Sequence, residues 1–272
     1  MKFLVTGANG FLGSRTVTVL RERGHDVAEL ARPLDAGSVD ARELIAGCDA
    51  VLHFAGVPDP ASAHGDPARA VRENAGTTLN LLEGCVEHRA ALVYPSTVRA
   101  AVERPPDEYA LSKRLGEIVC RLHRAPATVV RFTSVFGPGQ LVDRGATGAI
   151  AWFAAKALDS EPIVIPGDAR RARDFVYVDD AVAALEQIVA GGRWNETVTV
   201  ASGVATPLIR AAELVVEAVG MPVPIETPGG ELPPGENESY VGDPQLDFSV
   251  RPLEEAIPTY VDWLRSVTQS RA

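Results

Sequence analysis

The sequence has few cysteines, no long apolar run and no surplus of basic residues. Its 272 residues include three cysteines, Cys48, Cys85 and Cys120, and contain neither a Cys-x-x-Cys pair nor a His/Cys cluster at metal-binding spacing. A disulfide scaffold and a clustered metal site are therefore excluded, and we expect small buried cysteines in a reducing cytoplasm. No apolar run reaches the roughly 18 residues of a membrane span. Gly7 and Gly10 interrupt the apolar start too early for a signal peptide.

Acidic residues outnumber basic ones by 36 to 26, which gives a formal net charge of −10. This charge repels phosphate backbones, so we expect neither nucleic acid nor an anionic membrane as a partner. Hydrophobic residues make up 46% of the chain, which is typical of a globular protein with one large domain or two smaller ones. Any anionic ligand must therefore be held by local features of the chain.

The first half of the chain alternates short apolar runs with longer amphipathic ones. Strands are expected at 3–5, 25–30, 50–54, 91–94 and 128–132, and helices at 11–23, 68–88 and 109–122. Strands that are apolar throughout and alternate with helices indicate a parallel sheet covered on both faces. The expected fold class is α/β, a Rossmann-type doubly wound parallel sheet.

After about residue 136 the periodic segments become shorter and Gly-Pro turns more frequent. Helices are still expected at 181–190, 208–219 and 252–265, whereas 222–234, which holds five prolines, is expected to be a loop. A small C-terminal substrate lobe interleaved with the first sheet fits this texture. The expected division gives residues 1–135 to the Rossmann domain, with 174–201 contributing to it, and residues 136–173 and 202–272 to the substrate lobe.

The segment Thr6–Gly13 joins the first expected strand to the first expected helix and contains glycines at 7, 10 and 13. Glycines allow a tight turn and a close approach of the backbone to a pyrophosphate, and the helix N-terminus offers free N–H groups. A glycine triplet at this position between strand and helix predicts a dinucleotide site. Such a site explains how an acidic chain holds an anion.

The end of the second strand bears on the choice between NAD and NADP. An acidic residue there accepts a hydrogen bond from the ribose 2′-hydroxyl, whereas here Leu30 and Ala31 are followed by Arg32. Arg32 is interpreted as a clamp for a 2′-phosphate, which favours NADP. Glu29 or Asp35 is within reach of a ribose in the alternative with NAD.

Tyr109 and Lys113 open a predicted helix four residues apart, which places the phenol and the ammonium on one helix face. A nearby lysine stabilises a phenolate, so the pair suits acid/base chemistry. Ser96 and Thr97 end the preceding strand at the carboxyl edge, where open α/β sheets bind ligands. A hydroxyl there can hydrogen-bond to a substrate carbonyl or alkoxide.

With these motifs in this order, the sequence resembles the extended short-chain dehydrogenase/reductase family, the NAD(P)-dependent sugar-nucleotide epimerases, dehydratases and 4-ketoreductases. The resemblance runs along nearly the whole chain. Further matching segments are 49–56, 74–83, 131–140 and 173–180.

The resemblance implies roles for individual residues. Tyr109 is the acid/base, Lys113 binds the nicotinamide ribose and lowers the pKa of the tyrosine, and Thr97 orients the reacting oxygen. The implied cofactor contacts are Gly7, Asn9, Gly10, Phe11, Leu12, Gly13, Arg32, Phe54, Ala55, Gly56, Asn74, Tyr109 and Lys113. The implied substrate contacts are Ser96, Arg99, Ser134 and Arg173, and no metal is expected. For Arg173 the alternative is an ion pair with Asp174 or Asp179.

Departures from the family pattern narrow the reaction. In the 4,6-dehydratases an Asp-Glu pair follows the catalytic threonine, whereas Val98 and Arg99 follow Thr97 here. The glutamate of the decarboxylases and the cysteine of the GDP-fucose synthase type are also missing from this place. The remaining chemistry is hydride transfer with a tyrosine proton, as in C4 epimerisation or keto reduction.

Since Arg32 favours NADPH, the hypothesis is NADPH-dependent reduction of a 4-keto-(deoxy)sugar nucleotide. The alternatives are an NAD-dependent sugar-nucleotide 4-epimerase and a non-catalytic NADP-binding sensor on the same fold. A non-nucleotide ketone or aldehyde also stays open as substrate, because Ser134 replaces the usual asparagine of its segment. A homodimer through the helices near 68–88 and 107–123 is a further expectation from the resemblance.

Overall fold

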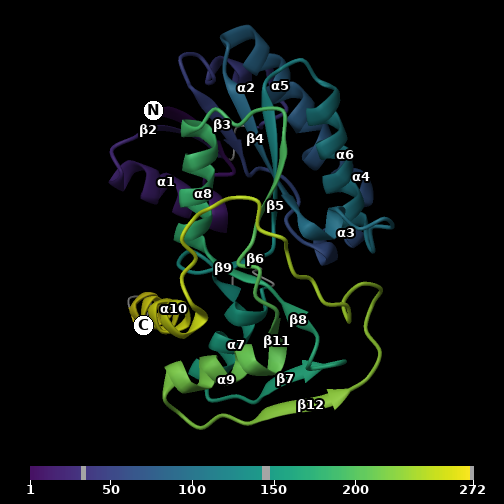
Figure 1. Cartoon of the computed structure of the whole chain (residues 1–272), viewed down its shortest axis with the longest axis vertical. Helices are drawn as coiled ribbons and strands as arrows, with labels where there is room; N and C mark the ends of the chain where they lie inside the picture. Colours follow the sequence, from purple (N-terminus) through teal and green to yellow (C-terminus); the bar gives the residue numbers. More distant parts are fainter. Residues whose placement is uncertain (32–34, 143–147, 270–272) are drawn as a thin grey trace. The chain divides into compact units, whose positions relative to one another are not determined.

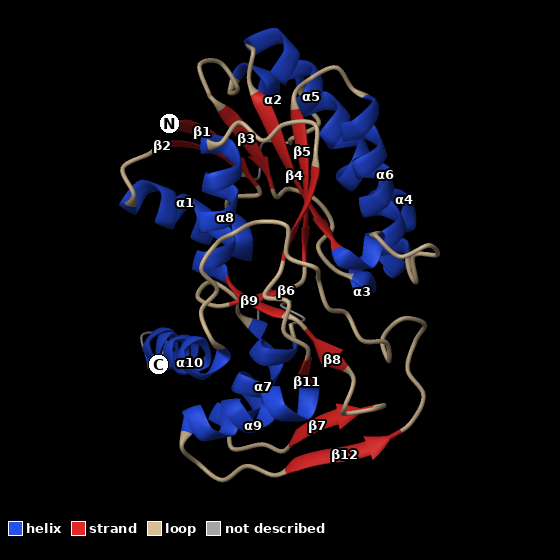
Figure 2. Cartoon of the chain, viewed as in Figure 1, coloured by secondary structure: helices blue, strands red, loops and turns tan. Residues whose placement is uncertain are grey.

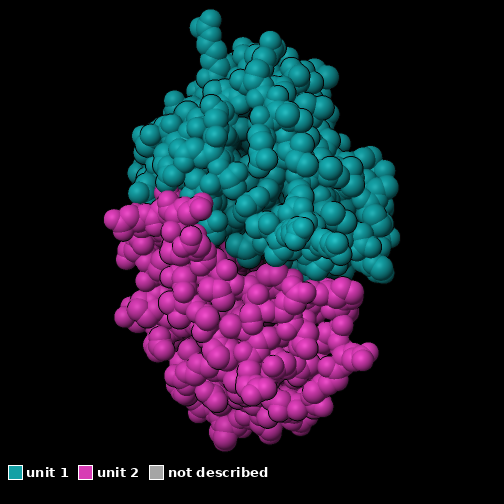
Figure 3. Space-filling model, turned by 45° about the vertical axis from the view of Figure 1, so that its right-hand side comes forward, with its two compact units in different colours: residues 1–132, 182–200 teal, residues 133–181, 201–272 magenta. Residues whose placement is uncertain are grey.

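The computed structural model describes residues 1–31, 35–142 and 148–269, which fall into two compact units (Figure 3). Unit 1 comprises Met1–Phe132 and Val182–Val200, and unit 2 comprises Thr133–Ala181 and Ala201–Ala272. Residues 133–135, 174–181 and 201, which the expected division gave to the Rossmann domain, belong to unit 2.

Unit 1 is built on a six-stranded sheet with the order β10-β5-β4-β3-β1-β2. Every neighbouring pair in it is parallel. Its strands are β1 (Lys2–Thr6), β2 (Asp26–Leu30), β3 (Ala50–His53), β4 (Ala91–Thr97), β5 (Ala127–Phe132) and β10 (Thr197–Val200). The direction of winding reverses between β1 and β3, so a crevice for ligands is expected at the carboxyl ends of these strands.

Helices cover both faces of this sheet, which confirms the expected fold class (Figures 1 and 2). On one face lie α1 (Phe11–Glu22) and α8 (Val178–Ala190), joined where Glu186 accepts hydrogen bonds from Arg23 and His25. The helices of the other face are α2 (Val39–Glu43), α5 (Thr77–His88) and α6 (Glu108–Leu122), with α3 (Pro60–Gly65) and α4 (Pro67–Val71) beside them. Buried side chains of α2, α5 and α6 form one core with β1, β3, β4 and β5.

The long helix expected at 68–88 is interrupted by one π-helical turn, η1 (Arg72–Gly76), between α4 and α5. In this turn the carbonyl of Asn74 accepts a hydrogen bond from the buried Tyr94 hydroxyl at 3.0 Å and another from Thr78 at 2.8 Å. Helix α6 passes so close that a Cβ on Gly116 would lie 2.2 Å from the Tyr94 hydroxyl oxygen. Glycine at position 116 therefore lets α6 pack against β4 and the π-helix.

Unit 2 combines short paired strands with three helices in its described part. Its elements are β6 (Ser134–Phe136), α7 (Ala149–Leu158), β7 (Ile163–Pro166), β8 (Ala172–Arg173), β9 (Phe175–Tyr177), β11 (Thr206–Pro207), α9 (Leu208–Val219), β12 (Ile225–Gly229) and α10 (Leu253–Gln269). Strands β6 and β9 pair in parallel, as do β7 and β12, whereas β8 and β11 are antiparallel. The rings of Phe175, Tyr177 and Tyr260 meet Phe136 edge-on at the centre of an apolar core.

The expectation of a loop over 222–234 is wrong for part of this segment, because Ile225–Gly229 forms β12. This strand has a single neighbour, β7, and its register shifts between Glu226 and Gly229. A proline is tolerated in an edge strand or at a bulge, where its missing N–H removes no ladder bond. Pro228 lies within this irregular stretch.

Asp174 joins the loops of unit 2. Its carboxylate is fully buried. One oxygen, Oδ1, accepts hydrogen bonds from the backbone N–H and hydroxyl of Ser202, at 2.9 and 2.7 Å, and from the Thr133 hydroxyl at 3.2 Å. The other, Oδ2, accepts from the backbone N–H groups of Gly203 and Gly242 at 2.9 and 3.2 Å. These donors replace the water that a buried carboxylate has lost.

Replacing Asp174 with asparagine should destabilise unit 2 strongly. The amide NH₂ would face backbone N–H donors such as those of Gly203 and Gly242. These N–H groups would lose their acceptor and would lie opposite another donor. We expect Asp174→Asn to lower the free energy of unfolding by about 2–4 kcal/mol, measured by urea denaturation. Asp168→Asn is the control, since Asp168 pairs with Arg170 at the surface and its loss should leave the urea midpoint nearly unchanged. Equal midpoints for both variants would contradict the role of Asp174.

Candidate active site

The turn between β1 and α1 is a tight cradle made of glycines. Gly7 has φ +66°, and a Cβ there would lie 2.7 Å from the backbone nitrogen of Ala55. A Cβ on Gly13 would lie 2.2 Å from the carbonyl oxygen of Gly7, so α1 can approach the turn only with glycine at 13. Gly10 is the N-cap of α1 without a side-chain hydrogen bond, and Asn9 beside it is exposed.

The turn therefore places the N-terminus of α1 shortly after the end of β1, and a helix N-terminus offers the free N–H groups that binding of a pyrophosphate requires. Of the other expected contacts in this segment, Phe11 and Leu12 are half-buried in the first turn of α1. Arg32, the expected 2′-phosphate clamp, lies outside the described residues. At the end of β2, Glu29 pairs with Arg21 at 2.7 Å, and Asp35 accepts a hydrogen bond from the N–H of Gly37.

A buried hydrogen-bond chain holds the segment after β3 against this turn. The N–H of Ala55 donates to Thr6 Oγ1 at 3.0 Å, and Thr6 Oγ1 lies 2.8 Å from His53 Nδ1. On the other side of the ring, Nε2 lies 3.2 Å from Thr77 Oγ1, which donates to the carbonyl of Glu73. Burial lowers the pKa of His53 to about 3, so its ring is neutral. The Thr77 donation leaves Nε2 as the protonated nitrogen and Nδ1 as the acceptor of the Thr6 hydroxyl.

Asn74 supports the same segment from the π-helix. Its Oδ1 accepts from the N–H of Val57 at 3.0 Å, and its Nδ2 donates to the carbonyl of Val57 at 3.2 Å and to Ser112 Oγ at 2.8 Å. A Cβ on Gly56 would lie 2.2 Å from this Oδ1. Asn74 is 1% exposed, so it holds the Phe54–Gly56 segment and α6 in place. This geometry gives Asn74 a supporting role, which differs from the direct cofactor contact expected from the sequence.

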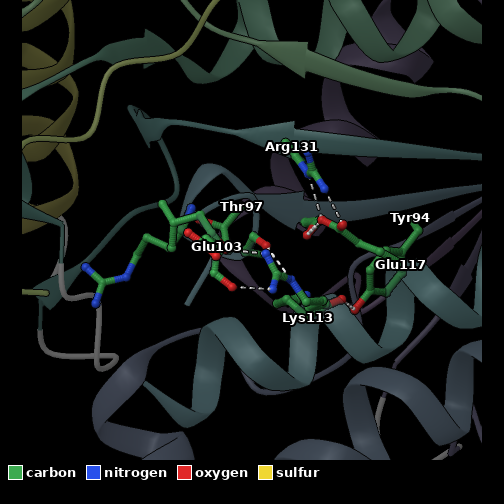
Figure 4. Close-up of polar contacts among 11 residues, drawn as sticks. Tyr94, Thr97, Glu103, Lys113, Glu117 and Arg131 are labelled. Carbon is green, nitrogen blue, oxygen red and sulfur yellow. Dashed lines mark hydrogen bonds and ion pairs between the residues drawn. The ribbon is translucent and has the colours of Figure 1, made fainter. Parts of the chain in front are cut away.

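Lys113 lies under the carboxyl end of β4 (Figure 4). It is 7% exposed, its Nζ donates to the carbonyl of Pro95 at 3.0 Å, and it stands 5.2 Å from the centre of the Tyr94 ring. Burial lowers the pKa of Lys113 to about 8, and the neighbouring Glu117 carboxylate opposes this shift. The ammonium is therefore charged at neutral pH and close to its titration.

Tyr109 is in the first turn of α6 and packs against a small apolar cluster that includes residues of α3 and α4. Burial raises its pKa above the usual value, with Asp107 and Asp59 acting in the same direction and Arg99 opposing them. The sequence predicted that Lys113 lowers this pKa. In this structure burial dominates instead, so the phenol keeps its proton at neutral pH.

Thr97 ends β4 and caps the short 3₁₀ helix η2 (Val98–Ala100), with its Oγ1 accepting from the N–H of Arg99 at 3.3 Å. The guanidinium of Arg99 donates to the carboxylate of Asp107, the N-cap residue of α6. Arg114 reinforces this connection by donating to carbonyls of the loop that follows, at 2.8 Å to Ala100 and 3.1 Å to Glu103. Thr97 is thereby fixed at the edge of the sheet, near the start of the helix that carries Tyr109.

Ser96 does not face an open site, because its hydroxyl donates to Glu117 at 2.6 Å. The same Glu117 carboxylate, 2% exposed, accepts two hydrogen bonds from Arg131 on β5, from Nε at 2.9 Å and from a terminal nitrogen at 2.6 Å (Figure 4). The sequence analysis assigned no role to either residue of this ion pair. The spacing of Glu117, one helical turn after Lys113, was the signal that could have found it.

Unit 2 contains the two remaining expected substrate contacts. Ser134 is in β6, where its N–H donates to the carbonyl of Asp174 at 2.8 Å. Arg173 donates to the carbonyls of Glu236 and Glu238, at 3.1 and 2.5 Å, and its guanidinium lies 5.1 Å from the ring centre of Tyr240. Asp174 was one of the alternative ion-pair partners of Arg173. Its carboxylate oxygens instead accept hydrogen bonds from Thr133, Ser202, Gly203 and Gly242.

The described ranges contain neither a membrane-spanning helix nor a clustered metal site. Within them no helix is both long and apolar enough to cross a membrane. No group of three or more His, Cys, Asp or Glu side chains there could hold a metal ion. The cysteines Cys48, Cys85 and Cys120 are free and buried.

Comparison with known proteins agrees with this geometry. A family model described as the NAD dependent epimerase/dehydratase family matches residues 3–201. The chain is 27% identical to a dTDP-4-dehydro-6-deoxy-D-allose reductase of Streptomyces bikiniensis, with 98% of this chain and 97% of the relative covered. It is 31% identical to a UDP-2-acetamido-2,6-beta-L-arabino-hexul-4-ose reductase of Pseudomonas aeruginosa, over 70% of this chain and 50% of that protein.

Among solved structures, MoeE5 in complex with UDP-glucose and NAD has a TM-score of 0.87 at 25% identity, covering 98% of this chain and all of that one. The UDP-glucose 4-epimerase of Thermotoga maritima with UDP-glucose has a TM-score of 0.85, also at 25% identity and the same coverage. The resemblance stated from the sequence is confirmed. Since the family model matches well over half of its residues, the chain belongs to the NAD dependent epimerase/dehydratase family.

Proposed function

We propose that the protein reduces a 4-keto-(deoxy)sugar nucleotide with NADPH. The observation that carries this proposal is the placement of Thr97, Tyr109 and Lys113 on neighbouring elements of unit 1, with Val98 and Arg99 after Thr97. The guanidinium of Arg99 is paired with Asp107, so this position offers no acid–base carboxylate pair for removing water. The similarity to two 4-ketosugar-nucleotide reductases supports the same reaction.

The residues present fit a dinucleotide. In the glycine cradle at 7, 10 and 13, a Cβ added at 7 or 13 would collide with the backbone, so only glycine fits there. Helix α1 begins at this turn without a side-chain cap. The Phe54–Gly56 segment is held beside this cradle, and Lys113 would bind the nicotinamide ribose. When bound, the cofactor supplies the hydride. We also propose a cytoplasmic location, which agrees with the three free cysteines.

In the proposed reaction Tyr109 gives its proton to the substrate oxygen as the hydride reaches the carbonyl carbon. Burial raises the pKa of this phenol, so Tyr109 enters the reaction protonated. The charged Lys113 on the same helix face stabilises the phenolate that remains, which then regains a proton from solvent. The Thr97 hydroxyl would orient the carbonyl oxygen.

The proposed substrate contacts differ in whether their side chains are already engaged by other residues of the protein. Ser96 and Arg99 are engaged with Glu117 and Asp107, so we assign them a positioning role. Arg173 remains the candidate for the diphosphate of a nucleotide sugar, with Ser134 as a second contact in unit 2. The nucleotide sugar itself is supported by similar structures whose titles name UDP-glucose.

An NAD-dependent 4-epimerase is the second candidate. The observation favouring it is the similarity to a UDP-glucose 4-epimerase over 98% of this chain. Both reactions would use Tyr109, and they differ in that an epimerase would have to keep its cofactor bound whereas a reductase would exchange it freely. The third candidate, a non-catalytic NADP-binding sensor, does not need the phenol of Tyr109.

The reaction is tested by adding a 4-keto-6-deoxysugar nucleotide and NADPH and following the near-ultraviolet absorbance of NADPH. We expect the wild type to consume NADPH and Tyr109→Phe to lose about 10²–10⁴-fold in kcat, because the proton donor is gone. The dissociation constant for NADPH should stay within about threefold in this variant. No NADPH loss, with NAD-dependent epimerisation of the 4-hydroxy sugar, would establish the epimerase. A ligand response that survives in Tyr109→Phe would establish the sensor.

The choice of cofactor is tested at Arg32. If this guanidinium binds the 2′-phosphate, Arg32→Ala should raise the dissociation constant for NADPH about 10–100-fold and leave that for NADH nearly unchanged, measured by calorimetry. Arg23→Ala is the control, because Arg23 pairs with Glu186 at the far end of α1. Equal weakening of both cofactors by Arg32→Ala would argue against the clamp.

We also propose that α6 forms a homodimer contact with a second copy of the chain. Leu111, Leu115, Ile118 and Leu122 are 41–80% exposed and follow one another at helical spacing on one face. Leu115→Glu combined with Ile118→Glu should convert a dimer into a monomer in light scattering after gel filtration. Val204→Glu, an exposed apolar position in unit 2, should remain dimeric. A monomeric wild type would refute the proposal.

A further inference from the structure

Two successive turns of α6 reach the same end of β4. Lys113 Nζ donates to the carbonyl of Pro95, and Glu117 Oε1 accepts from the hydroxyl of Ser96, the next residue. Ser96 is also the direct cross-strand neighbour of Arg131 on β5, which binds both oxygens of Glu117. One buried carboxylate therefore connects the helix to two adjacent strands, directly before Thr97.

We propose that Glu117 is a positioning residue: bound to Ser96 and Arg131, it fixes α6 on the carboxyl end of β4 and supplies the negative charge that faces the Lys113 ammonium. The ion pair sets the height and rotation of the helix, since a bidentate carboxylate–guanidinium contact tolerates little displacement. Because Lys113 lies one turn from Glu117 on this helix, its place under β4 follows from the same contact.

Among the groups around Lys113, the Glu117 carboxylate is the charge that acts on the pKa of Lys113. On β3, His53 is neutral because burial lowers its pKa to about 3, and on β4 the Tyr94 phenol stays protonated because burial raises its pKa well above 10. Tyr109 on α6 is neutral for the same reason. Charged groups near α6 include the ion pairs Arg99–Asp107 and Arg69–Glu73. His64 and His123 contact Glu108 and Glu83, and Asp59, which acts on Tyr109, accepts hydrogen bonds from Ser62.

The two members of the ion pair should move Lys113 in opposite directions. Glu117→Gln removes the carboxylate that opposes desolvation, so the pKa of Lys113 should fall below its value of about 8. Arg131→Gln removes the guanidinium that binds both oxygens of Glu117, so more of the negative charge of this carboxylate acts on Lys113 and the pKa of Lys113 should rise. If the contact served only stability, both variants would lower the melting temperature, and they would not shift the pKa of Lys113 in opposite directions.

The chain makes a direct measurement feasible, because it contains only three lysines, Lys2, Lys113 and Lys156. With lysine labelled with ¹³C at the ε-carbon, the NMR spectrum holds three signals, and Lys113→Arg identifies the one of interest. We expect the Lys113 titration midpoint to move down by about one pH unit in Glu117→Gln and up by a comparable amount in Arg131→Gln. Glu83→Gln, which removes the exposed partner of His123, is the matched control and should leave the midpoint unchanged.

A Lys113 midpoint that neither variant moves, or that both move downward, overturns the proposal. If Glu117→Gln does not fold, the upward shift in Arg131→Gln tests the charge by itself. The effect on turnover rests on the proposed function: the alkaline limb of the kcat–pH profile should move with the NMR midpoint in each variant. If the wild type turns over no 4-keto sugar nucleotide, the proposed function fails, whereas the NMR titration still decides the role of Glu117.

Discussion

The ion pair between the buried Glu117 carboxylate and Arg131 is the interaction on which the candidate active site depends. A carboxylate that is 2% exposed is tolerable only with its charge paired and its oxygens hydrogen-bonded, and Arg131 with Ser96 meets both conditions. Arg131 binds both oxygens of Glu117, and such a contact tolerates little displacement of α6 from its position. Tyr109, Lys113 and the packing of Gly116 against the Tyr94 hydroxyl follow from that position.

Neutral polar side chains hold the backbone at the carboxyl ends of β1 and β3, next to the candidate active site. His53 links Thr6 to Thr77, and Asn74 links Val57, which follows the Phe54–Gly56 segment, to Ser112. These side chains hold irregular backbone at the place where the winding of the sheet reverses, and they do so without burying an unpaired charge. The glycine cradle at the start of α1 is thus the local feature that would hold an anion, although the chain carries a net charge of −10.

Membership of the family fixes the fold and leaves the reaction open. The chain covers almost the full length both of a reductase relative and of a solved 4-epimerase, at similar identity. Either proposed reaction would use Tyr109 and Lys113 on α6 with Thr97 at the end of β4, so similarity of fold does not separate them. The separating features are local: the residues after Thr97, the residue after β2 and the contacts of unit 2.

The sequence by itself determined the sheet, the glycine turn and the Tyr109–Lys113 spacing, because these depend on local periodicity and on glycines at fixed intervals. The helix expected at 208–219 has those bounds in the structure. Tertiary structure alone decided the partners of the buried carboxylates: Arg131 from another element for Glu117, and donors up to 68 residues away for Asp174. It also decided that burial raises the pKa of Tyr109, that a π-turn interrupts the 68–88 helix, and that a proline-rich segment pairs with β7. Each of these outcomes depends on which atoms from distant parts of the chain exclude water from one another, and a local pattern carries no record of that.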